Sequence, residues 1–406
     1  MDNWSTYELG TVVDFASGSS FPTKYQNSLN EKFDFYKVSD MNDIRNQKYM
    51  ETATNTVSED IVKKLNCKVH PENTIILPKV GAALMTNKRR ILTKPSVFDN
   101  NIMGLMAKKG LNNQYLFYFL QIIDLRKYAQ IGAVPSINKS ILSAIPIEVP
   151  NRYNEQQKIA EVLSSIDELI EKTEQIITQT EKVKKGLHQH LLRRGIGHKR
   201  FQSTSIGEIP TEWELVRLGD LFNNASIKKS SHLQVLTVTQ NQGVIPRDDF
   251  NMNIKYNKNS LDTYKKVQKG NFIISLRSFQ GGLEMSNYEG IVSPAYTVLE
   301  KKADIDEEFF KHFFKSFWFI EQLKSSTIGI RDGKQIAFND FKLIKVGLPS
   351  LKEQVEIAKR LKTVEQKIRL ENNKKEKLYS MKQGLMQQLF TGKIRVPVDD
   401  EEVMTT

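Results

Sequence analysis

Few residues of this chain have the types and the spacing that chemistry needs. His188 and His190 are the closest pair of histidines, but residues two apart lie on opposite sides of a helix, unlike metal ligands spaced by four. Gly195-Ile196-Gly197 is a lone Gly-x-Gly after a helical pattern, which favours a helix stop over a dinucleotide site. Glu300-Lys301-Lys302 has the form of a nuclease triplet, yet no Asp-containing strand accompanies it. These patterns predict neither a metal site nor a nucleotide site.

The motifs of several enzyme classes are absent from the sequence. It has no Gly-x4-Gly-Lys-Ser/Thr loop for nucleotide hydrolysis, and no Pro-Pro pair for the loop with which adenine methyltransferases hold a flipped base. Cys67 is the single cysteine, which excludes an intramolecular disulfide and a cysteine-rich zinc cluster. We therefore expect no catalytic residue, no metal and no cofactor in this chain.

Length and charge indicate several domains and an anionic partner. A chain of 406 residues exceeds the size at which a single core keeps growing, so two or more domains are expected. The formal net charge of +12 favours nucleic acid over a membrane surface, because no basic amphipathic segment stands out. The start of the chain lacks the pattern of a leader, and no stretch reaches the roughly 18 apolar residues of a membrane span. We expect a cytoplasmic protein that does not enter a membrane.

The chain contains one unit twice. Glu155-Gln156-x-x-Ile159-Ala160 returns as Glu353-Gln354-x-x-Ile357-Ala358, an offset of 198 residues that then holds without a gap through the following helical stretch. With small gaps the likeness extends upstream, where Trp4-x4-Leu9-Gly10 parallels Trp213-x4-Leu218-Gly219. A fixed period of this length indicates an internal duplication of nearly the whole chain.

Each unit ends in a long helical stretch, residues 155–195 and 352–395, with one apolar seam. Apolar residues recur three and four positions apart, at Ile159, Leu163, Ile166, Ile170, Leu187 and Leu191 and, in the second copy, at Ile357, Leu361, Val364, Ile368, Leu385 and Leu389. Such a stripe must be covered, and its own copy is the obvious cover, so we expect an intramolecular coiled coil. Polar residues interrupt the seam at Thr173, Thr180, Lys184, Glu371, Lys375 and Lys382. They suit register setting or a further partner, and solvated flanks of an imperfect seam explain them equally well.

Each unit begins with a lobe that mixes strands and helices. Short β-like runs occur at residues 74–77, 271–276 and 295–299, and an aromatic helical pattern follows them at 115–125 and 307–323. The stretch 195–210 has the composition of a linker. The predicted fold class is therefore α+β: two α/β lobes, residues 1–154 and 196–351, separated by two long antiparallel helices, with a pseudo-twofold internal repeat and a tail at 396–406.

The order of these motifs resembles the specificity subunit of type I restriction-modification systems. The resemblance rests on the paired Glu-Gln-x-x-Ile-Ala helices, on the Trp-x4-Leu-Gly openings of the lobes, and on the ending Gly384-Leu-Met-Gln-Gln-Leu-Phe-Thr-Gly392-Lys-Ile. It covers nearly the whole chain. It implies two target-recognition domains that each read half of a bipartite, asymmetric site in double-stranded DNA, with the helix pair as the spacer between them.

The resemblance also implies partners, in the cytoplasm of a bacterium or an archaeon. Members of that family recruit two methyltransferase subunits, which use S-adenosylmethionine to methylate adenine at N6. Restriction and translocase subunits, which use ATP and Mg, complete the complex. The specificity subunit itself performs no catalysis and binds no cofactor.

Residues that could read DNA are polar or cationic and stand in expected loops. In the first lobe these are Ser19, Ser20, Thr23, Lys24, Lys79, Lys88, Arg89, Arg90, Ser136, Asn138 and Lys139. In the second lobe they are Lys228, Lys229, Gln240, Gln242, Arg277, Phe279, Gln280, Arg331, Lys334 and Gln335. The run 88–90 is the expected phosphate clamp, and residues 277–280 combine a guanine-type reader, a stacking ring and an adenine-type reader. Ordinary surface solvation explains any single one of these residues equally well.

Three other functions fit parts of the sequence. A stand-alone regulatory or architectural DNA-binding protein would use the same two lobes without enzymes, and a neighbouring methyltransferase gene would distinguish the two hypotheses. A coiled-coil scaffold would show no salt-dependent affinity for DNA. An enzyme with an unrecognised site would need activity from the purified chain alone.

Overall fold

The structure is a computed structural model that describes residues 4–130, 132, 134–239, 242–249, 258–276, 278–326 and 336–397, without the side chains of residues 258, 259, 279, 325 and 326. It divides into two compact structural units, which differ from the two sequence repeats described above. Unit 1 is residues 1–173 with 374–406, and unit 2 is residues 174–373. Each unit takes in one lobe and a segment of both long helices. The predicted domains are consecutive ranges of the chain, whereas unit 1 combines two separate ranges. The predicted domain boundaries remain a prediction. Residues 398–406 of the predicted tail lie outside the described residues.

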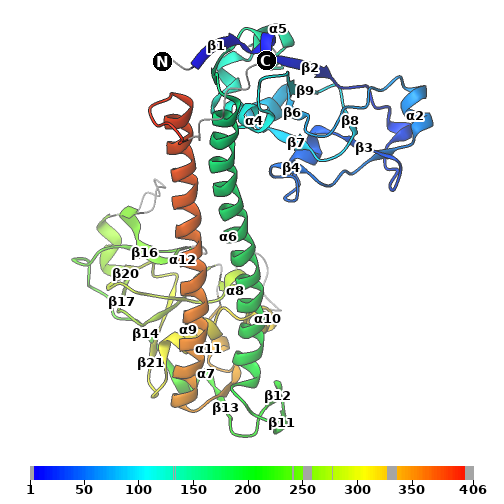
Figure 1. The fold of residues 1–406 in the computed structure, drawn as a ribbon. Helices are drawn as coiled ribbons and strands as arrows, with labels where there is room; N and C mark the ends of the chain where they lie inside the picture. The colour runs from blue at the N-terminus through cyan, green and yellow to red at the C-terminus, as the bar shows by residue number, and fades with distance from the viewer. Residues whose placement is uncertain are drawn as a thin grey trace. The chain divides into compact units, whose positions relative to one another are not determined.

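Two long helices supply segments to both units. Helix α6 spans Tyr153–Arg194 and helix α12 spans Leu351–Phe390, drawn in green and in orange to red in Figure 1. Gly195 and Gly392 follow them with φ of 65° and 63°, the left-handed conformation with which helices commonly end. The second helix therefore stops before the predicted residue 395. In the described part of the chain, no helix is long and apolar enough to cross a membrane.

Within each unit, the two helix segments share a core with their own lobe. In unit 1, Leu163 of α6 and Leu389 of α12 belong to one buried cluster with the aromatic helix α4 (Asn113–Ile122). In unit 2, Leu191 of α6 and Leu361 of α12 join the helix α9 (Glu307–Phe313) in the same way. Inside each unit the early segment of one helix thus packs on the late segment of the other, which is the antiparallel arrangement. The lobes therefore cover part of the apolar seam, which was expected to be covered by the other long helix alone.

The predicted seam is buried unevenly. The fully buried positions are Ile159, Leu163, Ile166, Ile170, Leu191, Ile357, Leu361 and Leu389, and the half-buried ones are Leu187, Val364, Ile368 and Leu385. Thr173 and Thr180 satisfy their hydroxyls within α6 by donating to the carbonyl oxygens four residues earlier, both at 2.7 Å. Polar seam positions of this kind therefore cost little.

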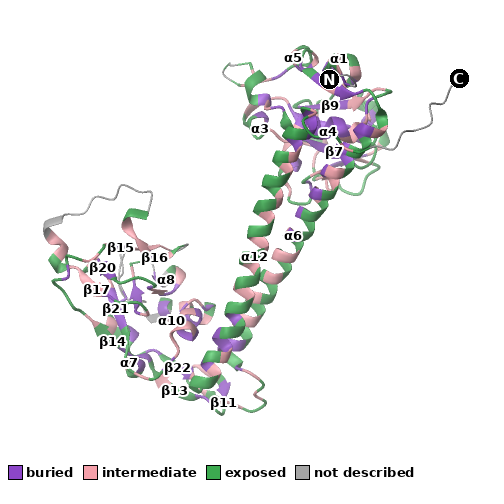
Figure 2. Ribbon diagram, turned by 60° about the vertical axis from the view of Figure 1, so that its left-hand side comes forward, coloured by how far each residue is buried: buried purple, intermediate pink, exposed green. Residues whose placement is uncertain are grey.

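Lobe 1 contains two sheets and an antiparallel strand pair. The larger sheet has the order β2-β9-β6-β7-β4, and the smaller has the order β5-β3-β8. Their bounds are Val13–Ser17 (β2), Ile102–Ala107 (β9), Ile75–Pro78 (β6), Arg90–Leu92 (β7), Tyr49–Met50 (β4), Thr56–Val57 (β5), Phe33–Tyr36 (β3) and Ser96–Phe98 (β8). Strand β1 (Trp4–Glu8) pairs with β10 (Pro146–Pro150), directly before α6. Figure 2 shows the buried residues of this lobe gathered around β9, β7 and α4.

The described residues of lobe 2 form one four-stranded sheet and four separate strand pairs. The sheet order is β14-β21-β18-β19, with bounds Phe222–Ala225, Thr297–Lys301, Phe272–Ile274 and Glu284–Met285. The pairs are β11 (Phe201–Thr204) with β12 (Gly207–Pro210), β13 (Glu214–Arg217) with β22 (Lys345–Leu348), β15 (Leu236–Thr239) with β16 (Gly243–Pro246), and β17 (Lys265–Val267) with β20 (Gly290–Val292). All of these pairings are antiparallel.

The duplication survives as a three-stranded core. Strands β2-β9-β6 of lobe 1 correspond to β14-β21-β18 of lobe 2, and each set is antiparallel throughout. At the start of each core, the Leu9 amide donates to Ile145 O and the Leu218 amide to Ile344 O, both at 2.9 Å. The lobes differ in the segment that comes after the first core strand, residues 18–74 in lobe 1 and 226–271 in lobe 2.

Two expectations for lobe 2 need correction. The stretch predicted as a linker, residues 195–210, contains the β11–β12 hairpin, in which Gly207 begins the second strand with a φ of 97°. The single aromatic helix predicted for residues 307–323 is two helices, α9 and α10 (Phe317–Ser326). The break occurs at Ser316, whose hydroxyl accepts a hydrogen bond from the Phe319 amide at 3.2 Å and so caps the second helix.

Candidate nucleic-acid interface

The paired Glu-Gln motif fastens each lobe to its helix. In unit 1 the Glu155 carboxylate accepts from the Trp4 indole at 3.3 Å, and the Arg395 guanidinium donates to both of its oxygens at 2.6 and 2.8 Å. In unit 2 the Glu353 carboxylate accepts from the Trp213 indole at 3.0 Å. Trp4 and Trp213 are the residues with which the lobes begin. Within each copy of the repeat, the tryptophan at the start of the lobe therefore contacts the glutamate at the start of the long helix.

The glutamine of the motif holds the aromatic helix of each lobe. Gln156 accepts from the Asn112 amide at 2.7 Å, and Gln354 accepts from the Asp306 amide at 3.0 Å. Asn112 and Asp306 are the N-cap residues of α4 and α9. The motif therefore orients the lobes, and the candidate reading loops stand on this fixed frame.

The candidate loop at residues 17–24 has a fixed base. Gly18 lies so close to the end of β8 that an added Cβ would be 1.9 Å from Asp99 O, which leaves room for glycine alone. The Ser19 amide donates to Phe98 O at 2.9 Å. Ser19 itself is half-buried. The backbone of the loop is thereby attached to the smaller sheet of lobe 1.

The outer part of this loop is exposed and cationic. Ser20, Thr23 and Lys24 are exposed. The ammonium groups of Lys24 and Lys64 lie 5.0 and 5.8 Å from the centre of the Tyr25 ring. Burial acts to raise the pKa of Tyr25, but the hydrogen bond from Lys64 and the charge of Lys24 outweigh it and lower that pKa. Hydroxyl and ammonium groups on a fixed loop are what base and phosphate contacts require.

Two other candidate segments of lobe 1 meet in space. The Ile137 amide donates to Lys79 O at 2.9 Å, which joins residues 136–139 to the end of β6. Lys79 and Ser136 are half-buried, whereas Lys139 is exposed. Asn138 caps helix α5 (Lys139–Ser143) with its side-chain oxygen, so that atom is already engaged. Of this group, Lys139 is best placed for a phosphate.

The structure contradicts the predicted clamp at residues 88–90. Arg89 and Arg90 are 3% and 8% exposed. Arg90 begins β7, which lies inside the larger sheet, and Arg89 directly precedes it. The Arg89 guanidinium donates to Ile123 O at 2.8 Å, and that of Arg90 donates to Met41 O at 3.1 Å. Burial lowers the pKa of both arginines to about 10. These two cations hold the lobe together, and Lys88, which is half-buried, is the single member of the run left near the surface.

In lobe 2 the described candidates are exposed. Lys228 and Lys229 follow β14, and Lys229 has a φ of 61°, in the left-handed region. Gln242 lies in the turn of the β15–β16 hairpin, where its backbone N–H donates to Thr239 Oγ1 at 2.9 Å. Gln280 is exposed on the short helix α8 (Ser278–Gly281). Gln240, Arg277, Arg331, Lys334, Gln335 and the side chain of Phe279 lie outside the described residues.

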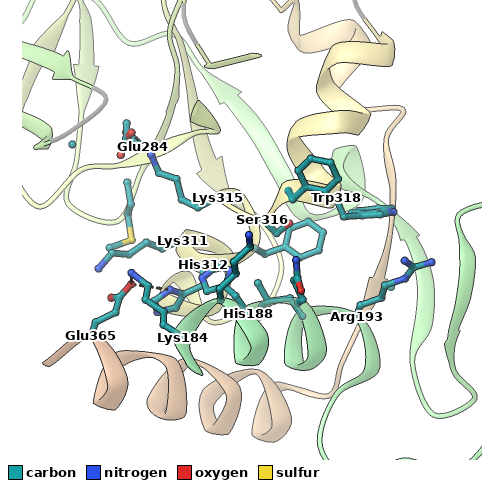
Figure 3. Close-up of a pocket in the computed structure, with 18 of the residues that line it drawn as sticks. Lys184, His188, Arg193, Glu284, Lys311, His312, Lys315, Ser316, Trp318 and Glu365 are labelled. Atoms are coloured by element: carbon teal, nitrogen blue, oxygen red, sulfur yellow. Dashed lines mark hydrogen bonds and ion pairs between the residues drawn. The ribbon is translucent and has the colours of Figure 1, made fainter. Parts of the chain in front are cut away.

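Unit 2 also contains an open cavity of about 1090 Å³ that the sequence did not predict (Figure 3). Two of the lysines in its lining are paired with acids that also line it, Lys184 with Glu365 at 2.8 Å and Lys315 with Glu284. These pairs leave less positive charge for a phosphate. His188 lies close by on α6, but within the described ranges no three His, Cys, Asp or Glu side chains come together to hold a metal ion.

The sequence model of one family matches this chain in two stretches. The family is described as the type I restriction modification DNA specificity domain, and the stretches are residues 1–182 and 210–380, one in each repeat. The chain belongs to this specificity family. The resemblance seen in the repeat motifs is thereby confirmed.

Two members of the specificity family match this chain over nearly their whole length. The MjaVIII type I restriction enzyme specificity subunit and the putative MjaX type I restriction enzyme specificity subunit, both from Methanocaldococcus jannaschii, are each 26% identical to this chain. Each match covers 97% of this chain and 94% of the relative. A crystal structure of the S subunit of the type I restriction-modification system from M. genitalium superimposes with a TM-score of 0.56 at 16% identity, covering 96% of both chains. This likeness confirms the predicted fold class.

Proposed function

We propose that this member of the specificity family is the non-catalytic DNA sequence-specificity subunit of a type I restriction-modification complex. The observation that carries the proposal is the family match over both repeats. Each matched repeat contains one lobe on a helix segment, so one chain provides two target-recognition domains. The predicted target is a bipartite site in double-stranded DNA, with unread base pairs between the halves.

The two half-sites are expected to differ. The lobes share their three-stranded core and the Trp-to-Glu anchor, but the described strands within residues 18–74 and within residues 226–271 pair differently. Direct readout depends on the side chains of such segments, whereas a shared frame carries no sequence information. A chain with one frame and two different reading segments recognises an asymmetric target.

The proposed contacts divide by chemistry. Exposed hydroxyl and amide side chains suit base edges, and exposed lysines suit phosphates. The proposed contact residues are Ser20, Thr23, Lys24 and Lys139 in lobe 1, and Lys228, Lys229, Gln242 and Gln280 in lobe 2. The net charge of +12 supports a large electrostatic part in the affinity.

The proposed partners supply the chemistry. Two methyltransferase subunits bind this chain and methylate adenine at N6 with S-adenosylmethionine, and restriction and translocase subunits use ATP and Mg. The setting is the cytoplasm of a bacterium or an archaeon. The names of the M. jannaschii relatives, which are specificity subunits of type I restriction enzymes, support this assignment.

Sequencing of modified adenines tests the proposal. The chain is expressed with its methyltransferase subunit in a host that lacks other adenine methylation, and the methylated motif is read across the genome. We expect one asymmetric motif in two parts, and no methylation when this chain is omitted. Methylation that persists without the chain, or that follows no motif, would contradict the proposal.

The stand-alone DNA-binding protein is the second candidate, and the comparisons do not favour it. It predicts that the chain purifies without a methyltransferase and binds DNA as tightly alone as with one. Co-purification of tagged chain from its own host separates the two candidates.

A further inference from the structure

In unit 1, three elements converge on one carboxylate. Asp167 of α6 accepts from the Tyr118 hydroxyl of α4 at 2.6 Å and from the Lys382 ammonium of α12 at 2.7 Å. Lys48 donates to the same Tyr118 oxygen at 2.8 Å. Lys382 and Asp167 are only 13% and 20% exposed. One carboxylate thus links the lobe, the first helix and the second helix.

Unit 2 repeats this arrangement with different residues. Glu365 of α12 accepts from the Lys184 ammonium of α6 at 2.8 Å, and the His312 ring of α9 faces the same carboxylate with Nδ1 at 3.9 Å. Figure 3 shows Lys184, His312 and Glu365 together at one end of the cavity, beside His188. Again one carboxylate links a lobe to both helices.

The two clusters occupy equivalent positions of the duplication. The offset of 198 residues relates Asp167 to Glu365 and Lys184 to Lys382, so acid and lysine exchange helices between the units. Tyr118 and His312 both lie six residues after the N-cap of their aromatic helix. Three elements have therefore kept a polar contact at the same place in two lobes whose sheets differ.

The polar contact is poorly explained as a device for stability alone. In unit 1 the Lys382 ammonium loses hydration on the helix seam, and a buried ion pair often contributes less stability than a well-packed apolar pair of the same size. In unit 2 the side chains of Lys184 and Glu365 are 37% and 35% exposed, and a solvent-exposed ion pair also contributes little stability. Its benefit is directional, because charge-assisted hydrogen bonds are short and angle-dependent, and a polar seam residue disfavours other registers. Burial and the Asp167 charge raise the pKa of Tyr118, so its hydroxyl remains a donor.

We propose that the cluster of Tyr118, Asp167 and Lys382 and the cluster of His312, Glu365 and Lys184 are positioning sites that seat each recognition lobe at one place on the helix pair. They act through the lobes and do not contact DNA. This inference rests on the proposed function, because the effect of a misplaced lobe is measured as a loss of sequence reading. A lobe that slides along its helices would keep its electrostatic attraction for DNA and lose its alignment with its half-site.

Charge reversal in the full chain, purified with its methyltransferase subunits, tests the proposal. The variants are Lys382→Glu, Asp167→Lys and the double reversal, and the probes are a duplex with the methylated motif and a scrambled duplex. We expect each single reversal to raise the Kd for the motif about tenfold, the order of one mismatched base pair. The Kd for the scrambled duplex stays unchanged, and the double reversal restores part of the motif binding lost in each single reversal. The rescue is partial because the Lys48 ammonium, which lies 3.7 Å from the Asp167 carboxylate, would face the new lysine. Lys377→Glu, an exposed lysine of the same helix, is the matched control for charge.

Half-site substitutions show which lobe is displaced. In Lys382→Glu, base changes in one half-site should cost less than in the parent, and base changes in the other half-site should cost the same. Lys184→Glu and its double reversal with Glu365→Lys should produce the mirror result. Where a reversal prevents folding, Tyr118→Phe removes the hydroxyl alone and is expected to raise the Kd for the motif about threefold.

The outcomes separate the positioning role from the proposed function. A parent complex that does not distinguish motif from scrambled duplex removes the proposed function itself. A parent that does so, with single reversals that bind the motif normally, or with a double reversal no better than either single one, overturns the positioning role. Equal loss on both half-sites would also overturn it, because it indicates general unfolding.

Discussion

Unit 1 and unit 2 fasten their lobes with the same bonds and then build different surfaces on them. Trp4 meets Glu155 as Trp213 meets Glu353, and Gln156 and Gln354 hold the aromatic helices in the same way. Beyond the three shared strands, lobe 1 has two further strands in its larger sheet and a second sheet, whereas lobe 2 adds one strand, β19, to its sheet and has the separate pairs β15–β16 and β17–β20. The duplicated part therefore orients the lobes, and the part that differs between the lobes can vary the DNA sequence that is recognised.

The anchors also differ between the units in what surrounds the glutamate. Glu155 is paired with Arg395, whereas Glu353 accepts from His198 Nε2 at 2.9 Å and from the Ile196 amide at 2.9 Å. The first arrangement needs an arginine from beyond α12, and the second needs only the turn after α6. Equivalent anchors can thus be completed by different partners, and four sets of variants test how far that equivalence extends.

Removal of the anchoring carboxylate is expected to have the largest effect. Glu155→Ala and Glu353→Ala each leave a buried indole N–H without its acceptor, and we expect each unit to lose about 3 kcal/mol of stability. Hydrogen exchange measured by mass spectrometry should show faster exchange in the unit that carries the change. Glu155→Gln keeps an acceptor and is the control. Exchange that rises equally in both units would show that the anchors are not local.

Two close backbone approaches give the next effect. A Cβ at Gly18 would overlap Asp99 O in lobe 1, and a Cβ at Gly282 would overlap Phe314 O in lobe 2, both at 1.9 Å. We expect Gly18→Ala and Gly282→Ala to cost about 2 kcal/mol each in urea unfolding, with Gly282→Ala the larger because its φ is +79°. Gly186→Ala, which meets nothing within 4 Å on α6, should be neutral or stabilising. A neutral Gly18→Ala would show that the loop base can move.

Acidification should affect unit 2 through a histidine that unit 1 lacks. His188 occupies the place of Met386 in the repeat, and burial, then the charges of His312 and Lys184, lower its pKa to about 4. Its pKa in the unfolded chain is about 6.5, so the unfolded state takes up the proton first as pH falls. Stability is therefore complete above about pH 7 and is lost as pH falls through about 6.5 towards 4.

The matched variant isolates this effect. Between pH 8 and pH 5, His188→Met should lose about 1–2 kcal/mol less unfolding free energy than the parent, after allowance for the partial exposure of the ring. Urea unfolding at both pH values measures the difference, and the contribution of histidines remote from His188 cancels. Equal losses in parent and variant would assign the pH dependence elsewhere.

The smallest effect on stability should separate surface cations from buried ones. Lys139→Ala should leave stability within about 0.5 kcal/mol and reduce the slope of log K against log salt by about 1, if the lysine meets one phosphate. Arg89→Ala should instead destabilise lobe 1 and leave that slope unchanged in the folded fraction. A reduced slope for Arg89→Ala with normal stability would restore the arginine to the interface.

Periodic features were predictable from the sequence, and features set by tertiary contact were not. The helix pair followed from the spacing of residues such as Leu163 and Leu361, because a period of 3.6 needs no partner to be recognised. The burial of Arg89 and Arg90 could not be seen, since a basic run on a loop and one on a central strand look alike until the sheet is formed. The break at Ser316 was missed for a similar reason, because the aromatic pattern continues across it.

The polar positions of the seam are visible in the sequence, but their partners are not. Lys184 and Lys382 interrupt the apolar pattern, whereas their acidic partners lie on the other helix, and sequence spacing along one helix does not reveal them. An alignment of the two aromatic helices from their N-caps, Asn112 and Asp306, places His312 at the position equivalent to Tyr118. The individual base contacts stay predictions, because they depend on the bound DNA.

Unit 1 is assembled from two distant parts of the chain, residues 1–173 and 374–406, whereas unit 2 is continuous. On the ribosome, lobe 1 is therefore made first and completed last, because Leu389 and Arg395 reach it only after all of unit 2 has been synthesised. Until then the apolar surface of Tyr115 and Leu163 lacks its final cover, and such surfaces bind chaperones or other chains. Long-range closure of this kind is slow. The order of synthesis thus makes lobe 1 the part of the molecule most dependent on protection during folding.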